Sequence, residues 1–299
     1  MKNSAGTKPE DRFPDDHTEM IRSILFPTDF GPSCVAMAPY VKRAASIFGA
    51  KVTLVHACDL NSHSGFELYA RPPGDIAEEH WNIAQRKLEL FLTSDFPTPN
   101  CPRILLVGDA AGVIADTAKK HKIDLIVMPT YAGRFRRMLL GSTTAKVLDD
   151  ADCPVLTSQH AESIAPRPLD HRKWVCGVGL SSDSERVLRY ARDAALAAGA
   201  TLSIVHAIPG SEVRSQSQGQ SEKEQEARQR LAELQSRVGS DASVFIAFGS
   251  VKEALLRAVR ESSADVLVMG RSPQTGALGR MRDLIYSVIR DSPCPVVSV

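Results

Sequence analysis

The chain repeats itself with a period close to half of its length. The segment Gly49–Ala57, with the sequence GAKVTLVHA, returns 150 residues later as GATLSIVHA at Gly199–Ala207. Two later blocks return with an offset of 141 residues: Asp124–Met128 as Asp265–Met269, and Cys153–Val155 as Cys294–Val296. Solenoid repeats are far shorter than this period, so the pattern indicates a duplicated domain.

The length of the chain fits two domains of near-average size. A chain of 299 residues is too long for one ordinary core, but each half is able to bury a sheet between helices. We expect residues 1–19 to form a disordered tail, 20–159 the first domain, 160–172 a linker and 173–299 the second domain. The tail mixes both charges with prolines and lacks the apolar stretch of a secretion signal.

The composition predicts a soluble cytoplasmic protein. The 36 basic and 35 acidic residues give a formal net charge of +1, so no global field favours nucleic acid or an anionic membrane. No window approaches the roughly 18 apolar residues that a membrane-spanning helix needs. The six cysteines include no CxxC pair, which fits reduced thiols in a cytoplasm better than a disulfide framework.

Short β-branched runs alternate with longer helical patterns in each half. This alternation predicts an α/β fold in which a parallel sheet is covered on both faces. The strands expected in the first half are Ile21–Pro27, Lys51–Ala57, Arg103–Val107, Asp124–Met128 and Val155–Ser158, with helices at Ser33–Phe48, Ile76–Asp95, Gly112–Lys120 and Ser142–Asp150. The strands expected in the second half are Trp174–Val178, Thr201–Ile208, Ser243–Phe248, Asp265–Met269 and Val296–Val299. Right-handed crossovers make each five-stranded parallel sheet doubly wound, and ligands then sit at its carboxyl edge.

Asp29 is expected at this edge, directly after the first strand. Its carboxylate could accept hydrogen bonds from an adenine or ribose, or could cap backbone donors of the next helix, and the sequence leaves both readings open. Ser33 is the expected N-cap of that helix. In the second half Gly179 occupies the place of Asp29, and glycine offers no acceptor side chain.

Four short motifs at strand ends and in the last loop resemble those of one known family. They are PTDF at 27–30, VHA at 55–57, LLGS at 139–142 and CPV at 153–155. Together they resemble the universal stress protein domain, and the resemblance covers essentially all of both halves. It implies an adenine nucleotide alpha hydrolase-like fold. In nucleotide-binding members, it also implies a loop of the pattern G-x-x-G-x9-G-[ST], whose amides and helix N-terminus hold phosphates.

The first half keeps only part of that loop. Pro129 and Ala132 stand at the two leading glycine positions, and eight residues separate Ala132 from Gly141. Proline removes an amide donor and alanine restricts positive φ, so the resemblance implies at most a weak or altered site for ATP or AMP. The neighbouring Arg136 and Arg137 could attract phosphates or could simply be solvated, and both readings stay open. The residues expected to form the site are Pro27, Thr28, Asp29, Val55, Met128, Gly133, Arg134, Gly141, Ser142 and Thr143.

The second half departs further from the pattern. Gly270 fits the first glycine position, but Pro273 replaces the second. Arg282 and Asp283 stand where the first half has Gly141 and Ser142, and a carboxylate at a helix start opposes a bound phosphate. We therefore expect the second domain not to bind nucleotide.

No residue is assigned as catalytic or as a metal ligand. His56 and His206 share one repeat position, but neither has a recognisable nucleophile or metal partner in its sequence context. Both are expected to be satisfied by local hydrogen bonds. Cys153 and Cys294 precede the last strand of each half and are expected to fill space as small buried residues.

The resemblance also implies how the two halves meet. Members of the family pair their last strands edge to edge, so the strands at Pro154 and Pro295 are expected to join the domains into an intramolecular pseudo-dimer, which protects both edges. Whether whole chains form a homodimer is left open by the sequence. The sequence also does not identify the protein partner.

The predicted function is a non-catalytic stress-response binding and signalling module. The alternative is an ATP-binding switch with slow ATP hydrolysis. A transferase or amidating enzyme would need a pyrophosphate motif such as SGGxDS near the first strand, and the sequence has none.

Overall fold

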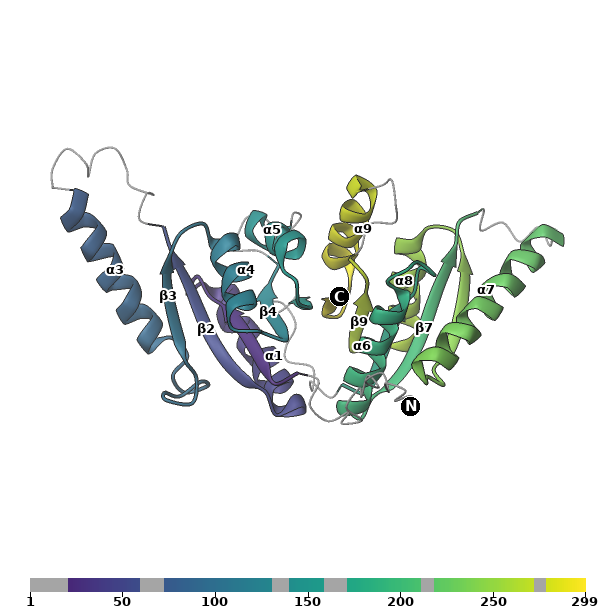
Figure 1. Cartoon of the computed structure of the whole chain (residues 1–299), viewed down its shortest axis with the longest axis horizontal. Helices are drawn as coiled ribbons and strands as arrows, with labels where there is room; N and C mark the ends of the chain where they lie inside the picture. Colours follow the sequence, from purple (N-terminus) through teal and green to yellow (C-terminus); the bar gives the residue numbers. More distant parts are fainter. Residues whose placement is uncertain (1–20, 60–72, 131–139, 159–170, 211–217, 272–277) are drawn as a thin grey trace, which may run out of the picture.

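A computed structural model gives the arrangement of the chain (Figure 1). It describes residues 21–59, 73–130, 140–158, 171–210, 218–271 and 278–299. The expected tail, most of the expected linker and the loop that contains Ala132, Gly133, Arg134, Arg136 and Arg137 lie outside the described residues.

Strands and helices alternate through the first half. Its strands are β1 (Ser23–Pro27), β2 (Lys51–Cys58), β3 (Arg103–Val107), β4 (Leu125–Pro129) and β5 (Val155–Ser158). Its described helices are α1 (Pro32–Phe48), α3 (Pro73–Leu90), α4 (Ala110–Lys120) and α5 (Ser142–Asp150). α1 ends at Gly49, whose φ of 63° is the left-handed conformation that favours glycine at a helix end.

The second half repeats this order. Its strands are β6 (Lys173–Gly177), β7 (Thr201–Ile208), β8 (Ser243–Phe248), β9 (Val266–Met269) and β10 (Val296–Ser298). Its described helices are α6 (Ser184–Ala197), α7 (Gln218–Val238), α8 (Val251–Ser262) and α9 (Leu278–Asp291).

All ten strands join in one sheet with the order β3-β2-β1-β4-β5-β10-β9-β6-β7-β8. Strands within each half are parallel, and the order reverses at the first strand of the half, which confirms the doubly wound prediction. The two final strands lie side by side: β5 and β10 are antiparallel, with Leu156 opposite Val297. The two five-stranded sheets are therefore continuous through the middle of the molecule.

An aspartate at the start of the fourth strand of each half ties that strand to the first one. Asp124 Oδ2 accepts hydrogen bonds from the backbone amides of Arg22 and Ser23, both at 2.9 Å. Asp265 Oδ2 accepts from the amides of Arg172 and Lys173 at 2.8 and 2.9 Å. The repeated aspartate of the sequence is therefore explained by strand pairing rather than by ligand chemistry.

Apolar side chains cover both faces of the sheet. Helices α1, α3, α6 and α7 contribute to the core on one face, and α4, α5, α8 and α9 contribute to the core on the other. Strand residues alternate between the two: Ile24 and Phe26 point to the first face, whereas Leu25 points to the second. Near-continuous burial along β1 is typical of a parallel strand that lies between two helix layers.

Several element bounds differ from the sequence prediction. The second predicted helix of the first half ends at Leu90 rather than Asp95, and Leu92 just beyond it adopts a φ of 49°, which no continuing helix allows. α4 begins at Ala110 because the side chain of Asp109 accepts a hydrogen bond from the amide of Gly112 and caps the helix. Among the described residues, no helix is long and apolar enough to cross a membrane.

Candidate functional site

A cavity of about 210 Å³ lies at the carboxyl edge of the first half of the sheet. Eight of the ten predicted nucleotide residues line it: Pro27, Thr28, Asp29, Val55, Met128, Gly141, Ser142 and Thr143. The remaining two, Gly133 and Arg134, lie outside the described residues. The structure therefore brings together residues at or near the ends of β1, β2 and β4 and the start of α5, which are up to 116 positions apart in sequence, from Pro27 to Thr143.

Asp29 belongs to the turn between β1 and α1, and it is exposed. Its Oδ1 accepts a hydrogen bond from the amide of Gly31 at 2.8 Å and lies 3.2 Å from the thiol sulfur of Cys34. Both contacts use the same oxygen, so Oδ2 is the atom through which the carboxylate can serve a ligand. The two readings of Asp29 are compatible, because its Oδ1 supports the turn while the residue as a whole lines the cavity.

The turn itself holds an unusual backbone conformation. Phe30 has a φ of 65°, and its amide donates to Oγ1 of Thr28 at 2.9 Å. Leu180, at the same position of the second half, has a φ of 54°. A positive φ costs a side-chain-bearing residue free energy, so both turns are held by their surroundings.

The predicted N-cap of α1 is wrong. Gly31 is the N-cap, Pro32 starts the helix, and Ser33 is buried within the first turn. Proline is favoured at the first helical position because its missing amide would have no helical partner there. The helix therefore begins one residue before the serine.

His56 lines the cavity from the end of β2. Its Nδ1 lies 2.7 Å from the backbone oxygen of Thr28, and a carbonyl can only accept, so Nδ1 carries the hydrogen. The ring also contacts that of Phe30, with 4.3 Å between centroids. His206 makes the same bond to the backbone oxygen of Val178, at 2.7 Å. Both histidines are thus satisfied by local hydrogen bonds, as predicted.

The N-terminus of α5 forms another side of the cavity. Gly141 is its N-cap and provides no side-chain acceptor, so the amides of the first turn lack a side-chain cap. The amide of Gly141 itself donates to the backbone oxygen of Thr130 at 2.8 Å. The hydroxyl of Thr144 donates to the backbone oxygen of Pro129 at 3.1 Å. The donors that remain toward the cavity are the amides that follow Gly141 and the hydroxyls of Ser142 and Thr143.

All six cysteines lie in the described part of the chain, and none of them forms a disulfide. Burial, together with the neighbouring Asp29 carboxylate, raises the pKa of the Cys34 thiol to about 12, so the thiol is neutral at physiological pH. Cys153 and Cys294 were expected to fill space as small buried residues. Both are only partly buried, which corrects the degree of burial, but both pack against the core that α4, α5, α8 and α9 cover.

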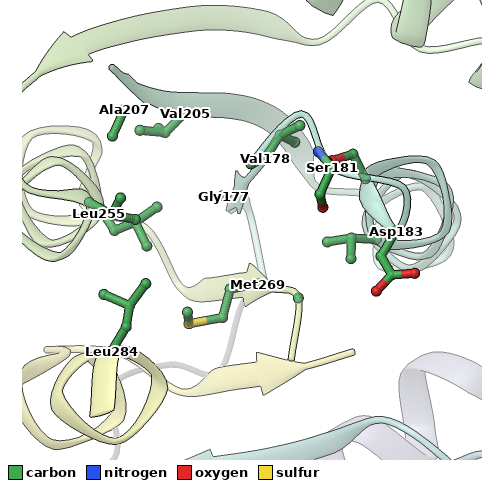
Figure 2. Close-up of a pocket in the computed structure, with 14 residues that line it drawn as sticks. Gly177, Val178, Ser181, Asp183, Val205, Ala207, Leu255, Met269 and Leu284 are labelled. Carbon is green, nitrogen blue, oxygen red and sulfur yellow. The ribbon is translucent and has the colours of Figure 1, made fainter. Parts of the chain in front are cut away.

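The second half has a smaller cavity at the equivalent place, with a volume of about 90 Å³. Figure 2 shows Leu255, Met269 and Leu284 converging on it, with Ser181 and Asp183 on the side of α6. A Cβ added at Gly177 would lie 2.7 Å from Cδ2 of Leu255, so the leucine occupies the space that a side chain would need there.

The differences between the two cavities follow the repeat. Val178 stands where the first half has Thr28, and Gly179 stands where it has Asp29. Leu284, inside α9, takes the place that Thr143 has in the first turn of α5. The second cavity therefore lacks, among the described residues that line it, the carboxylate and hydroxyl groups found at these positions in the first.

Sequence reasoning missed part of the lining. The additional residues of the first cavity are Cys34, His56, Ala57, Ala110, Ile114, Pro129 and Thr144. Ala110 and Ile114 are four positions apart on α4, a spacing that places them on one helix face. That spacing is visible in the sequence. The sequence does not show, however, which face of α4 is turned toward the edge of the sheet, because this depends on how α4 packs on the strands.

Known proteins share both the sequence pattern and the architecture of this chain. The model of the universal stress protein family matches residues 20–158 and again residues 171–299. A universal stress protein encoded in the QAH/OAS sulfhydrylase 3′ region of Thermus aquaticus is 31% identical over 148 residues, covering 46% of this chain and 98% of that protein. Universal stress protein MJ0531 of Methanocaldococcus jannaschii is 28% identical over 144 residues, covering 46% and 81%.

Among solved structures, a universal stress protein from Archaeoglobus fulgidus superposes with a TM-score of 0.64 at 20% identity, covering 94% of this chain and 96% of that one. A putative universal stress protein from Pseudomonas aeruginosa gives a TM-score of 0.63 at 19% identity, covering 95% of each chain. At these identities the likeness concerns the fold.

Proposed function

The chain belongs to the universal stress protein family, and we propose that it is a non-catalytic, cytoplasmic stress-response module whose first domain binds an adenine nucleotide. The second domain binds none and serves as the structural partner of the first. The module acts through contacts with a protein partner rather than through turnover.

The observation that carries this proposal is the composition of the first cavity. An exposed carboxylate and an uncapped helix N-terminus border the same space of about 210 Å³. The carboxylate of Asp29 suits the hydrogen-bond donors of an adenine or ribose, and the start of α5 suits a phosphate. Apolar walls from Val55, Ile114 and Met128 suit the faces of a base.

The donors at α5 suffice for one phosphate group. Pro129 has no amide, and the amide of Gly141 is already bonded to Thr130. The amides and hydroxyls of Ser142 and Thr143 remain, and a phosphate has three oxygens to satisfy. The hydrogen-bond donors of the described residues thus suit the single phosphate of an AMP-like ligand at least as well as the three phosphates of ATP.

The test measures binding to the full chain. Its thermal unfolding is followed with AMP, and with ATP and magnesium, each at up to millimolar concentration, because a ligand of the native state raises apparent stability. Asp29→Asn is expected to weaken binding about tenfold, the loss of one hydrogen bond to a charged group. Asp183→Asn, which alters a carboxylate beside the second cavity, is the matched control and should leave binding unchanged.

No stabilisation by either nucleotide would refute the proposal. Release of phosphate from ATP is measured in the same samples. Release above background that is lost in Asp29→Asn would favour a hydrolytic switch instead of a module without turnover.

A further inference from the structure

Helix α5 has no residue of its own that complements either end of its dipole. Its first turn contains no acidic residue, its last turn contains no basic one, and it ends in Asp149 and Asp150. Carboxylates at a helix C-terminus are unfavourable, whereas cations there are favourable. At nine residues the helix is also far below the length at which isolated helices are stable. What holds its C-terminal end must come from elsewhere in the molecule.

Arg271 of the second domain supplies that cation. Its Nη1 donates to the backbone oxygen of Leu148 at 2.9 Å, and its Nη2 donates to the backbone oxygen of Cys153 at 2.8 Å. Its own amide is bonded to the backbone oxygen of Val299 at 2.9 Å, so the guanidinium is anchored in the seam between the domains. One side chain thus satisfies a C-terminal carbonyl of α5 and fixes the chain that follows the helix.

Two residues of α9, Tyr286 and Arg282, contact the side of α5. The hydroxyl of Tyr286 lies 3.2 Å from the backbone oxygen of Ala145 and 3.1 Å from Oδ2 of Asp149. Arg282 pairs with the same carboxylate oxygen at 3.0 Å. Helices α5 and α9 face each other across the middle of the molecule in Figure 1. The carboxylate at the unfavourable end of α5 is therefore neutralised by the other domain.

The second domain holds α5 of the first through these contacts, but the first domain does not hold α9 in the same way. By the repeat offset, Arg271 corresponds to Thr130, Arg282 to Gly141 and Tyr286 to Ala145, and none of these counterparts has a side chain that could reach α9 in the same way. Helix α9 instead carries Arg290 in its own last turn. Arg282, which stands at a position where the second domain departs from the phosphate-loop pattern, thus pairs with the helix of the first domain, and Arg271 adds two further hydrogen bonds.

We infer that Arg271, Arg282 and Tyr286 are positioning residues for the first-domain site, holding α5 so that its N-terminal amides face the cavity before a ligand arrives. This rests on the proposed function, because the ligand is the nucleotide proposed for that cavity. If α5 is already held in place, nucleotide binding does not have to order it. Loss of the contacts that hold α5 therefore lowers the affinity for nucleotide. Coupling between sites is reciprocal, so bound nucleotide should also tighten the contact between α5 and α9.

The experiment uses the full chain with Arg271→Met and Tyr286→Phe, separately and together. Hydrogen exchange of the α5 amides is followed by mass spectrometry, and AMP and ATP affinities are measured by calorimetry. Arg230→Met is the matched control, because Arg230 donates to the backbone oxygen of Leu180 at 3.0 Å within the second domain. Urea unfolding confirms that each variant is folded.

We expect the double variant to exchange its α5 amides faster and to bind nucleotide at least about fivefold more weakly, the lower end of typical couplings. The control should change neither. Faster exchange with unchanged affinity, or unchanged exchange, would overturn the inference and leave the proposed function standing. If the unaltered chain binds neither nucleotide, the proposed function is wrong and the coupling with it.

Discussion

Leu255 lies over Gly177, so that a single methyl group added to the glycine would stand 2.7 Å from the leucine Cδ2 atom. Both residues line the smaller cavity of the second domain, and Pro27 and Ile114, at the same repeat positions, line the larger cavity of the first. The difference between the halves is thus built into their cores as well as into their surface loops.

Gly177→Ala should therefore destabilise the chain by about 1–3 kcal/mol, the usual cost of overpacking a filled core. Leu255→Ala also costs stability, because it leaves a cavity, but it removes the clashing atoms, so the double variant should lose less than the sum of the two single losses. A double-mutant cycle from urea unfolding measures the difference. Gly112→Ala is the control: its added Cβ meets nothing closer than 4.0 Å inside α4, so stability should not fall. Strict additivity of the two core changes would contradict the contact.

Asp124→Ala and Asp265→Ala should each cost about 1–3 kcal/mol. Each removes an acceptor shared by two backbone amides at the start of a strand, and such donors are costly when they lose their partner. Because the two sites are equivalent in the repeat, similar losses are expected in thermal unfolding. Asp116→Ala, at an exposed position of α4, is the comparison variant, and its effect on stability should be small. A neutral result for both strand aspartates would refute their structural role.

Cys34 should be slow to react with iodoacetamide in the native chain. Its pKa of about 12 leaves about one thiolate in ten thousand at pH 8. The rate should rise about tenfold per pH unit from pH 8 to pH 10 while the chain stays folded. Peptide mass spectrometry distinguishes Cys34 from the other five cysteines. A native rate that equals the rate in urea would contradict this environment.

Acid should remove the contribution of Asp291 at the end of α9. The hydrogen bond from Arg290, aided by Lys252, lowers its pKa to about 2. A lowered pKa in the folded state means that the stabilisation is present above about pH 4 and is lost as the pH falls toward 2. Asp291→Asn should thus be less stable than the unaltered chain at pH 7 and equally stable near pH 2. A difference that is independent of pH would exclude the charge as its cause.

Much of the fold was predictable because the domain is duplicated, so that each sequence signal for a strand or helix occurs in two copies. Strand runs, the order of elements and the family resemblance are properties of local sequence, and duplication made each of them visible in two copies. Eight of the ten expected site residues line one cavity because the carboxyl ends of parallel strands share one edge. The sequence also predicted the local hydrogen bonds of His56 and His206.

Ser33 was expected to cap α1, although Pro32 beside it is the local signal that places the start of the helix one residue earlier. Other features depend on three-dimensional packing that no local pattern encodes. Arg282 was read as the loss of a phosphate position, and its ion pair with Asp149 could be seen only once the domains were placed together. The closure of Gly177 by Leu255 similarly joins residues that are far apart in sequence.

The two halves are unequal, and we propose that nucleotide binds only to the first. Equilibrium dialysis of the full chain with labelled AMP and ATP, at saturation, counts bound nucleotide per chain, with Asp29→Asn and Asp183→Asn measured beside it. We expect one nucleotide per chain, with affinity reduced by Asp29→Asn and unchanged by Asp183→Asn. Two nucleotides per chain, none at millimolar concentration, or one that is weakened by Asp183→Asn alone would contradict it.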